Sequence, residues 1–422
     1  MNQGIIAAIL SIIFYLTSLL GGSNAQPTAP LGLVPVEQQT VSSVMGKRAV
    51  VLGDTISLRS GPDLQYQAVT ALPGGTEVTI LQAENGWYKV RYGQGRDGWI
   101  PGNSVALQEA EQGRDKKLMV LGYYFLGGPS FGAMLEHGTT LTSISPWSWA
   151  LRDNGTLVED FDPRGLGESL LFAGNHGLKT YALIHSAGTE HMAALLTNPG
   201  AQRTAVANIK KLLQEWGVHG VHFHLADIPP NLRDELTAFV AETAAALKEA
   251  GLETSIAVPA KTANGQAGSA ATAYDYAALG REVDFMVITA YDQHHQGSSP
   301  GPIAGADWVE EVVQYAVSQV SPEKLVLGIP VYGYHWFPTG QVQTITHVQA
   351  MELAAAEGIK VRWHSQHKVP YFENNGEAVW FENRYSVQAK LHIAETYELT
   401  GIALWPLGQE DTGIWKVLDQ AS

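Results

Sequence analysis

The sequence predicts an α/β protein whose larger part is a (β/α)8 TIM barrel with a small inserted α+β subdomain, preceded by a small all-β barrel. Two observations lead to this prediction. In residues 118–422, strand-like apolar runs alternate with amphipathic helical stretches, and eight such β/α units fit a TIM barrel. In residues 46–108, only short β-type runs occur, separated by turn residues.

The composition is that of a globular protein with one large and one small domain. The chain has 422 residues, of which 45% are hydrophobic and 16% charged. The formal net charge of −15 argues against nucleic acid and anionic lipid as partners, because these attract clustered Lys and Arg. There is no cysteine, which excludes disulfides, thiolate chemistry and a cysteine-linked lipid anchor. We expect no cofactor.

The first 25 residues are predicted to be a signal peptide. An apolar run over residues 5–20 is followed by small residues at 21–25 that are typical of a cleavage site. No Lys or Arg precedes the apolar run, so an uncleaved membrane anchor is the alternative, and membrane contact is expected only in that case. Either outcome places the rest of the chain outside the cytoplasm. Residues 26–45, rich in Pro, Thr, Gln and Ser, are predicted to be a linker.

The small all-β domain is predicted over residues 46–108, with strands at 49–52, 76–81, 87–92 and 98–100. Three motifs, at residues 58–63, 86–90 and 98–100, resemble the bacterial SH3-like domain along its whole length. Members of that family commonly dock exported proteins onto cell-wall peptide or glycan, so the resemblance implies a wall-targeting module. The alternative is that Trp87 and Trp99 are only core residues of a small barrel. Residues 109–117 form a charged second linker.

The large domain is predicted over residues 118–422. Its eight strands are expected at 119–124, 143–151, 180–185, 220–226, 254–259, 284–292, 325–332 and 402–407, with helices such as 201–216 and 232–250 between them. Short β-type runs within residues 361–381 predict the inserted subdomain. In such barrels the functional site lies at the carboxyl ends of the strands.

The fourth predicted strand reads His219-Gly220-Val221-His222-Phe223-His224-Leu225-Ala226. It resembles the Asp-Gly-x-Asp-x-Asp-x-Glu signature of glycoside hydrolase family 18, the chitinase-like barrels, with every acidic position replaced. Most of residues 117–422 also resembles the spore and cell-wall branch of that family, at 121–124, 144–146, 183–185, 289–292, 327–334, 368–372, 379–383 and 404–411.

The resemblance implies that chitinase-type catalysis is nearly absent. Family 18 enzymes use the N-acetyl oxygen of the substrate as nucleophile and need one protein acid to protonate the leaving oxygen. Alternate residues of a strand share a face, so His222, His224 and Ala226 are expected in the barrel interior, with Ala226 at the position of the acid. Alanine has no proton to give, and loss of the acid alone costs on the order of 10² to 10⁴ in rate.

Asp227 is the candidate substitute acid. Strand alternation predicts that its side chain points to the opposite face, so we expect it to cap the Pro229-Pro230 turn and the helix that follows. An altered glycosidase that uses Asp227 as acid stays open as an alternative.

The histidines raise a second alternative, a metal-dependent hydrolase. His222 and His224 are expected on one inward face and His185 at the end of the neighbouring strand, and three imidazoles can hold Zn²⁺ with an open position for water. We favour no metal, with His222 and His224 hydrogen-bonded within a polar layer. His294 and His295 follow the sixth strand and are expected to make loop contacts.

Sugar-binding chemistry survives at the other strand ends. The predicted substrate-binding residues are Tyr124, Trp147, Tyr291, Asp292, Tyr332 and Trp405. By family resemblance, Trp405 forms the floor under the sugar and the Tyr291-Asp292 pair hydrogen-bonds it. Packing in the barrel is the alternative for each aromatic, above all for Trp147 and its neighbour Trp149. The sequence therefore predicts an exported, cell-wall or spore-associated binder of N-acetylglucosamine-containing glycan, either peptidoglycan or a chitin-type polymer. A protein-interaction scaffold with a vestigial groove is a third alternative.

Overall fold

The computed structural model describes residues 44, 46–93, 96–108, 118–126, 128–159, 161–186, 188–263 and 270–421. The predicted leader, nearly all of the first linker and the whole second linker lie outside these ranges. Within them, no helix is both long and apolar enough to cross a membrane. By their internal contacts, the residues fall into two compact units: residues up to 115 with 163–178, and residues 116–162 with 179–422.

The first unit contains the predicted small all-β domain. Its seven strands form one antiparallel sheet in the order β3-β2-β6-β5-β4-β1-β7. Their bounds are β1 Arg48–Val51, β2 Thr55–Arg59, β3 Ala68–Pro73, β4 Glu77–Glu84, β5 Trp87–Tyr92, β6 Arg96–Pro101 and β7 Val105–Leu107. Asn85 and Gly86 join β4 to β5 with φ of 50° and 78°, as expected for a tight two-residue hairpin. Trp99 is buried, in agreement with the packing role considered for it.

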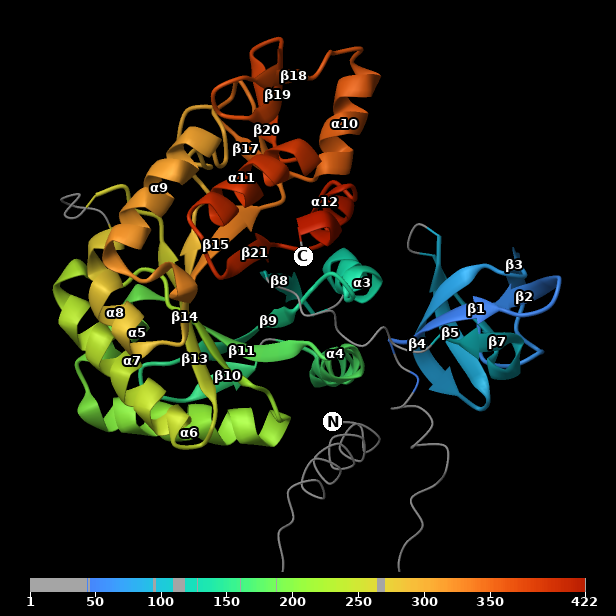
Figure 1. Cartoon of the computed structure of the whole chain (residues 1–422), viewed down its shortest axis with the longest axis horizontal. Helices are drawn as coiled ribbons and strands as arrows, with labels where there is room; N and C mark the ends of the chain where they lie inside the picture. The colour runs from blue at the N-terminus through green and yellow to red at the C-terminus, as the bar shows by residue number, and fades with distance from the viewer. Residues whose placement is uncertain are drawn as a thin grey trace, which may run out of the picture. The chain divides into compact units, whose positions relative to one another are not determined.

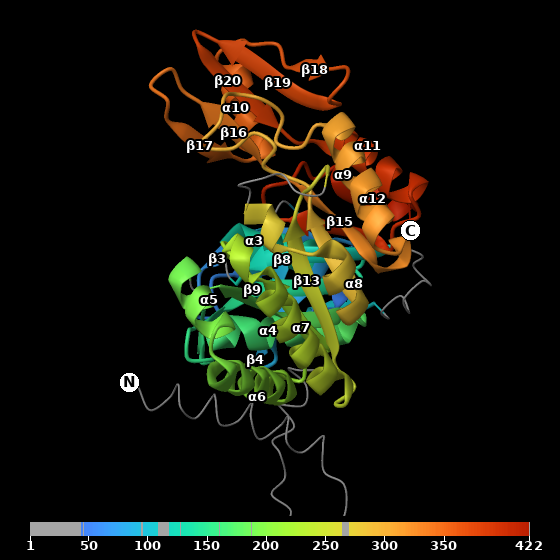
Figure 2. The same ribbon diagram turned by 90° about the vertical axis from the view of Figure 1, so that its left-hand side faces the viewer.

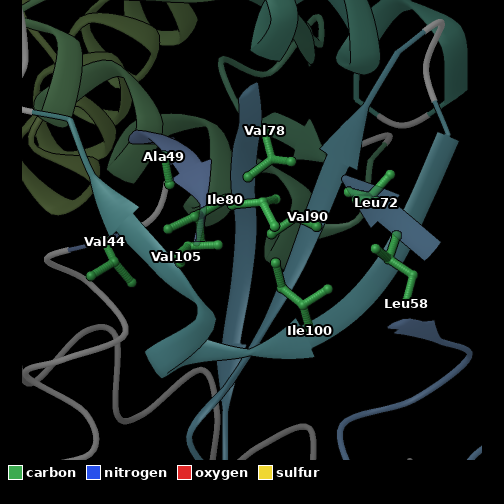
Figure 3. Close-up of a cluster of buried hydrophobic side chains, with 10 residues drawn as sticks. Val44, Ala49, Leu58, Leu72, Val78, Ile80, Val90, Ile100 and Val105 are labelled. Carbon is green, nitrogen blue, oxygen red and sulfur yellow. The ribbon is translucent and has the colours of Figure 1, made fainter. Parts of the chain in front are cut away.

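A compact apolar core holds this sheet together (Figure 3). Each of the seven strands contributes at least one side chain to it, and β1 and β4 contribute two each at alternate positions. The core residues are Val44, Ala49, Val51, Leu58, Leu72, Val78, Ile80, Val90, Ile100 and Val105.

The second unit is the predicted TIM barrel, and all eight strands are confirmed (Figure 1). In chain order they are β8 Met119–Phe125, β9 Ser143–Leu151, β11 Lys179–Ser186, β12 Gly220–His224, β13 Glu253–Pro259, β14 Phe285–Thr289, β15 Leu325–Pro330 and β21 Gly401–Trp405. Each pairs in parallel with its neighbours, and pairing of β21 with β8 and of β8 with β9 closes the barrel. A short strand β10, Leu157–Glu159, pairs antiparallel with β9.

Helices lie outside the strands, as the alternating pattern predicts (Figure 1). They are α3 Gly128–His137, α5 Thr189–Leu196, α6 Pro199–Trp216, α7 Arg233–Lys248, α8 Tyr276–Glu282, α9 Ala306–Gln319, α11 Arg384–Thr396 and α12 Ile414–Ala421. Helix α4, Pro163–His176, lies between β10 and β11 in the chain. Asn198 caps α6 by accepting hydrogen bonds from the backbone N–H groups of Gly200 and Ala201, and Gly217 ends that helix in the left-handed conformation.

The inserted subdomain is larger than predicted. It comprises β16 Gly333–Trp336, β17 Val342–Ile345, α10 His347–Ala356, β18 Arg362–His364, β19 Val369–Asn374 and β20 Glu377–Phe381, which Figure 2 shows gathered beyond the end of β15. Its sheet has the order β17-β16-β20-β19-β18. The sequence pattern places its start at residue 361, because the apolar run of β15 continues into β16 without a polar break and only the later strands stand out as separate.

Candidate functional site

A cluster of aromatic rings lies at the carboxyl ends of the barrel strands, where the family pattern predicts the site. Trp405 ends β21, and its ring centroid lies 5.3 Å from that of Trp147, 5.6 Å from that of Tyr123 and 5.7 Å from that of Phe125. Trp405 is half-buried and Phe125 is 43% exposed, so the cluster presents aromatic surface to solvent. Flat apolar rings of this kind are suited to stacking on ligand rings.

A β-bulge aims Trp147 into the barrel. In the pairing of β11 with β9, Leu183 lies opposite Trp147 and Ile184 lies opposite Trp149, so Ser148 is an extra residue without a partner in the ladder. The extra residue reverses the alternation: Trp147 joins the inner cluster, whereas Trp149 is buried against Phe161 and Trp216. Packing accounts for Trp149, whereas Trp147 packs against the inner core with part of its surface exposed and stays a candidate binding residue.

On β8, the predicted Tyr124 does not belong to the site. Its ring lies beside Phe131 of α3 and is almost fully buried, because alternation along β8 turns it away from the barrel interior. The inward residues of β8 are its neighbours Tyr123 and Phe125, neither of which the sequence prediction named.

His222 is fully buried beneath this cluster, and both of its ring nitrogens are engaged. The single hydroxyl proton of Ser255 is donated to the backbone oxygen of Val221 at 3.0 Å. The Nδ1–H of His222 must therefore donate to Ser255 Oγ at 2.8 Å, and Nε2 accepts from the hydroxyl of Tyr123 at 2.7 Å. Burial, with a smaller contribution from the charge of His224, lowers the pKa of His222 to about 3, so the ring is neutral.

His185 and His224 lie side by side above His222. They occupy directly paired positions on β11 and β12, and their ring centroids lie 4.8 Å and 5.2 Å from that of Trp147. Nδ1 of His185 donates to the carbonyl of Ser186 at 3.1 Å, whereas its buried Nε2 has no hydrogen-bond partner in the described structure. Burial lowers the pKa of His224, and the charge of His185 lowers it further. A hydrogen bond between His224 and its own backbone raises the pKa and offsets part of this shift.

The geometry does not support the metal alternative. Both nitrogens of His222 are used by Tyr123 and Ser255, which leaves this ring no lone pair for a metal ion. Among the described residues, no group of three or more His, Cys, Asp or Glu side chains is arranged to hold one.

Ala226 lies just past the end of β12, two residues beyond His224, and is half-buried. Its backbone N–H donates to Ser186 Oγ at 3.1 Å, which ties this position to the end of β11. The expectation that Asp227 caps the following helix is wrong, because neither the short 3-10 turn at Pro230–Leu232 nor α7 has a side-chain cap. Asp227 is exposed with φ of 57°, outside the strand, so the alternation argument does not apply to it.

The first signature position, His219, lies at the opposite end of β12 from the site. Its Nδ1 accepts hydrogen bonds from the backbone N–H and the hydroxyl of Thr180, so it is a structural residue. Gly220 allows close strand packing, since a Cβ there would lie 2.3 Å from the carbonyl oxygen of Glu253 on β13.

Asp292 is held at the mouth of the barrel by two tyrosines. Its Oδ1 accepts hydrogen bonds from Tyr332 at 2.5 Å and from Tyr334 at 2.9 Å. Tyr332 and Tyr334 belong to an apolar cluster that includes residues of β16, β19 and β20, against which Tyr291 and Trp405 also pack. The structure therefore brings together Trp147, Tyr291, Asp292, Tyr332 and Trp405, five of the six predicted binding residues.

The loop after β14 also behaves as predicted. His294 Nδ1 bonds the carbonyl of Ser299, and His295 Nδ1 accepts from the backbone N–H of Gly297, so both histidines hold the loop's own conformation.

Comparison with known proteins agrees with this architecture. The model of Glycosyl hydrolases family 18 matches residues 173–410, and that of the Bacterial SH3 domain matches residues 54–106. The chain is 29% identical to the putative sporulation-specific glycosylase YdhD of Bacillus subtilis over 300 residues, which are 68% of this chain and 71% of YdhD. It is 28% identical to a cortical fragment-lytic enzyme of Bacillus anthracis, with 66% of this chain and 67% of that protein covered.

Among solved structures, a chitinase from Chromobacterium violaceum superimposes with a TM-score of 0.68 at 27% identity, covering 72% of this chain and 98% of the chitinase. The spore cortex-lytic enzyme SleL of Bacillus megaterium, at 22% identity and a TM-score of 0.66, shares the fold and covers 88% of this chain and 89% of its own.

Proposed function

The chain belongs to glycosyl hydrolase family 18 and carries a bacterial SH3 domain, and from this premise we propose that it binds N-acetylglucosamine-containing glycan of the cell wall without cleaving it. The single observation behind the proposal is a contrast. The cluster of aromatic rings around Trp405 is present, whereas the position of the acid in the family signature is occupied by Ala226. Stacking and hydrogen bonding to a sugar need only the aromatic rings, whereas glycoside cleavage needs an acid, which an alanine cannot supply.

The inner polar layer supports loss of turnover. His222 is neutral and hydrogen-bonded at both ring nitrogens. It therefore cannot stabilise, as a carboxylate would, the positive charge that develops during glycoside cleavage. His224 and His185 are imidazoles as well, so the barrel interior beneath the cluster of aromatic rings carries no carboxylate on β11 or β12.

The similarity to a putative sporulation-specific glycosylase and to a cortical fragment-lytic enzyme supports a cell-wall or spore setting, outside the cytoplasm. The SH3 domain would then hold the protein on the wall, and the barrel would engage the glycan strand. Domain limits at residues 46–108 and 118–422 are part of this proposal.

The test incubates the purified protein with insoluble peptidoglycan and with chitin oligosaccharides, follows binding by co-sedimentation and looks for fragments by mass spectrometry. Binding without fragments is the expected result. Fragments lost in Asp227→Asn would replace the proposal with an altered glycosidase, and fragments that require added Zn²⁺ would replace it with a metal hydrolase. Absence of binding to every glycan would leave the scaffold alternative.

A further inference from the structure

We infer that the His185–His224 pair is a recognition site for a carboxylate on the bound sugar, so that the barrel selects an acidic amino sugar over neutral chitin. This inference rests on the proposed glycan-binding function and specifies its ligand. The two imidazoles are paired across β11 and β12 and both contact the indole of Trp147, within the aromatic cluster that contains Trp405.

A pair of imidazoles and a pair of carboxylates favour ligand groups of opposite charge. An aspartate next to the sugar repels an anionic substituent, whereas an imidazole that takes up a proton becomes a cationic hydrogen-bond donor. Nδ1 of His185 already donates to Ser186, so in the neutral ring Nε2 carries a lone pair, and this nitrogen is buried without a partner in the described structure. A buried polar nitrogen without a partner is costly, and a protonated Nε2 paired with a ligand oxygen removes that cost.

The side chains packed against the pair carry no charge. His222, from the same strand as His224, is committed to Tyr123 and Ser255 and stays neutral. Trp147 of β9 and Trp405 of β21 add uncharged rings around the pair.

The other titratable groups at the barrel mouth interact with residues outside the pair. Tyr291, after β14, interacts electrostatically with Tyr123, and Asp227 does so with Tyr274. Asp292 accepts hydrogen bonds from Tyr332 and Tyr334. The main opposition to protonating His224 is burial, to which the charge of His185 adds, and a carboxylate bound between the two rings would offset both.

The nitrogen of His185 is covered in this structure, so the ligand has to displace a side chain. Trp147 stacks on the face of the His185 ring with an interplanar angle of 20° and is half-buried, so it is one neighbour whose movement would open a path to the pair.

Two kinds of sugar carry such a group: an amino sugar with a lactyl ether, as in muramic acid, and a uronic acid with a C6 carboxylate. In peptidoglycan the lactyl carboxylate is free only where the stem peptide has been removed, because the peptide is attached to it through an amide. The site would therefore favour peptide-free glycan strands.

The test measures binding of three ligands to the full-length protein by titration calorimetry: N-acetylglucosaminyl-N-acetylmuramic acid, its carboxamide, and diacetylchitobiose. The acid is expected to bind more tightly than its amide. Its affinity should increase as the pH falls from about 8 to about 5.5, by up to about tenfold per pH unit for one proton taken up. Titrations in two buffers of different ionisation enthalpy count that proton directly, and a glucuronic acid disaccharide distinguishes the two sources of carboxylate.

His185→Gln and His224→Gln should each reduce the ratio of acid to amide affinity and flatten its pH dependence, with folding checked by circular dichroism. Equal affinity for acid and amide, or binding without proton uptake, would overturn the inference while the proposed function stands. Failure of all glycans to bind would overturn both.

Discussion

The hydroxyl of Tyr123 donates a 2.7 Å hydrogen bond to Nε2 of His222, across the interior of the barrel from β8 to β12. This bond needs a neutral imidazole, and burial lowers the pKa of His222 from its usual 6.5 to about 3. Protonation of His222 would turn Nε2 into a donor, so the Tyr123 hydroxyl could no longer donate to it. Stability of the barrel and acidity of the medium are thereby coupled through one pair of side chains.

The first prediction concerns that coupling. Between about pH 3 and 6.5 the unfolded chain binds a proton at this histidine and the folded chain does not, so the free energy of unfolding rises with pH by up to about 1.4 kcal/mol per unit. His222→Gln should flatten this part of the curve, measured by urea unfolding at several pH values. The exposed His392→Gln is the control and should keep the wild-type slope. An unchanged slope in His222→Gln would contradict the neutral assignment.

The second prediction concerns the aromatic floor. Trp405→Ala should weaken glycan binding by about 30-fold, the scale of a buried aromatic anchor at about 2 kcal/mol. Trp363→Ala, which removes a 43%-exposed indole from β18, is the matched control and should bind as the wild type does. Co-sedimentation with insoluble glycan at several protein concentrations measures both. Equal loss in the two variants would point to nonspecific adsorption.

The third prediction is a gain of function. Combining Ala226→Glu, His224→Asp and His222→Asp restores a transferable proton and two inward carboxylates, and the carboxylate introduced by His222→Asp could still accept from Tyr123. We expect measurable release of fragments from chitin oligosaccharides, at least about 10²-fold above the wild type. Ala226→Glu alone should release fewer. A folded but inactive triple variant would mean that the barrel has lost more than its acid.

The fourth prediction concerns Asp411, beyond the end of β21. Burial would raise its pKa, but hydrogen bonds from the Arg384 side chain and from the backbone N–H groups of Arg384 and Gly413 outweigh this and hold it at about 2. The depressed pKa adds stability above about pH 4 that is lost as the pH falls toward 2. Asp411→Asn should cost about 1–3 kcal/mol at neutral pH, measured by urea unfolding. The exposed Glu373→Gln should cost almost nothing, and an equal cost in both would contradict this account.

The fifth prediction concerns the fully buried ion pair between Lys390 and Glu382, whose charged atoms lie 2.7 Å apart. Burial raises the pKa of Glu382 and lowers that of Lys390, so neither charge is stable there alone. Lys390→Met should destabilise the protein by about 3–5 kcal/mol, whereas adding Glu382→Leu should recover most of the loss. Thermal unfolding of the wild type and the two variants tests this, and a double variant less stable than Lys390→Met would refute it.

The sequence was sufficient to predict the eight strands, because the alternation of apolar runs and amphipathic helices does not depend on which residues occupy the functional site. It was insufficient at three places where local geometry departs from simple periodicity. The extra residue Ser148 separates Trp147 from Trp149, a reversal that a period of two cannot reveal. The pattern does not specify which face of β8 points inward, so it predicts Tyr124 and misses Tyr123 and Phe125. Asp227 lies past the end of β12 in a left-handed conformation, where strand alternation no longer applies.

The chain enters the inserted subdomain at Gly333 and leaves it at Phe381, and these two residues are direct partners in the pairing of β16 with β20. A Cβ on Gly333 would lie 2.5 Å from that of Phe381, so the two segments cross the boundary in close contact. An insertion with adjoining ends can be lengthened, shortened or exchanged in evolution while the parent strands keep their places. The apolar surface of the inserted subdomain that packs against Trp405 can thus diversify independently of the barrel, and ligand preference can change there without a new fold.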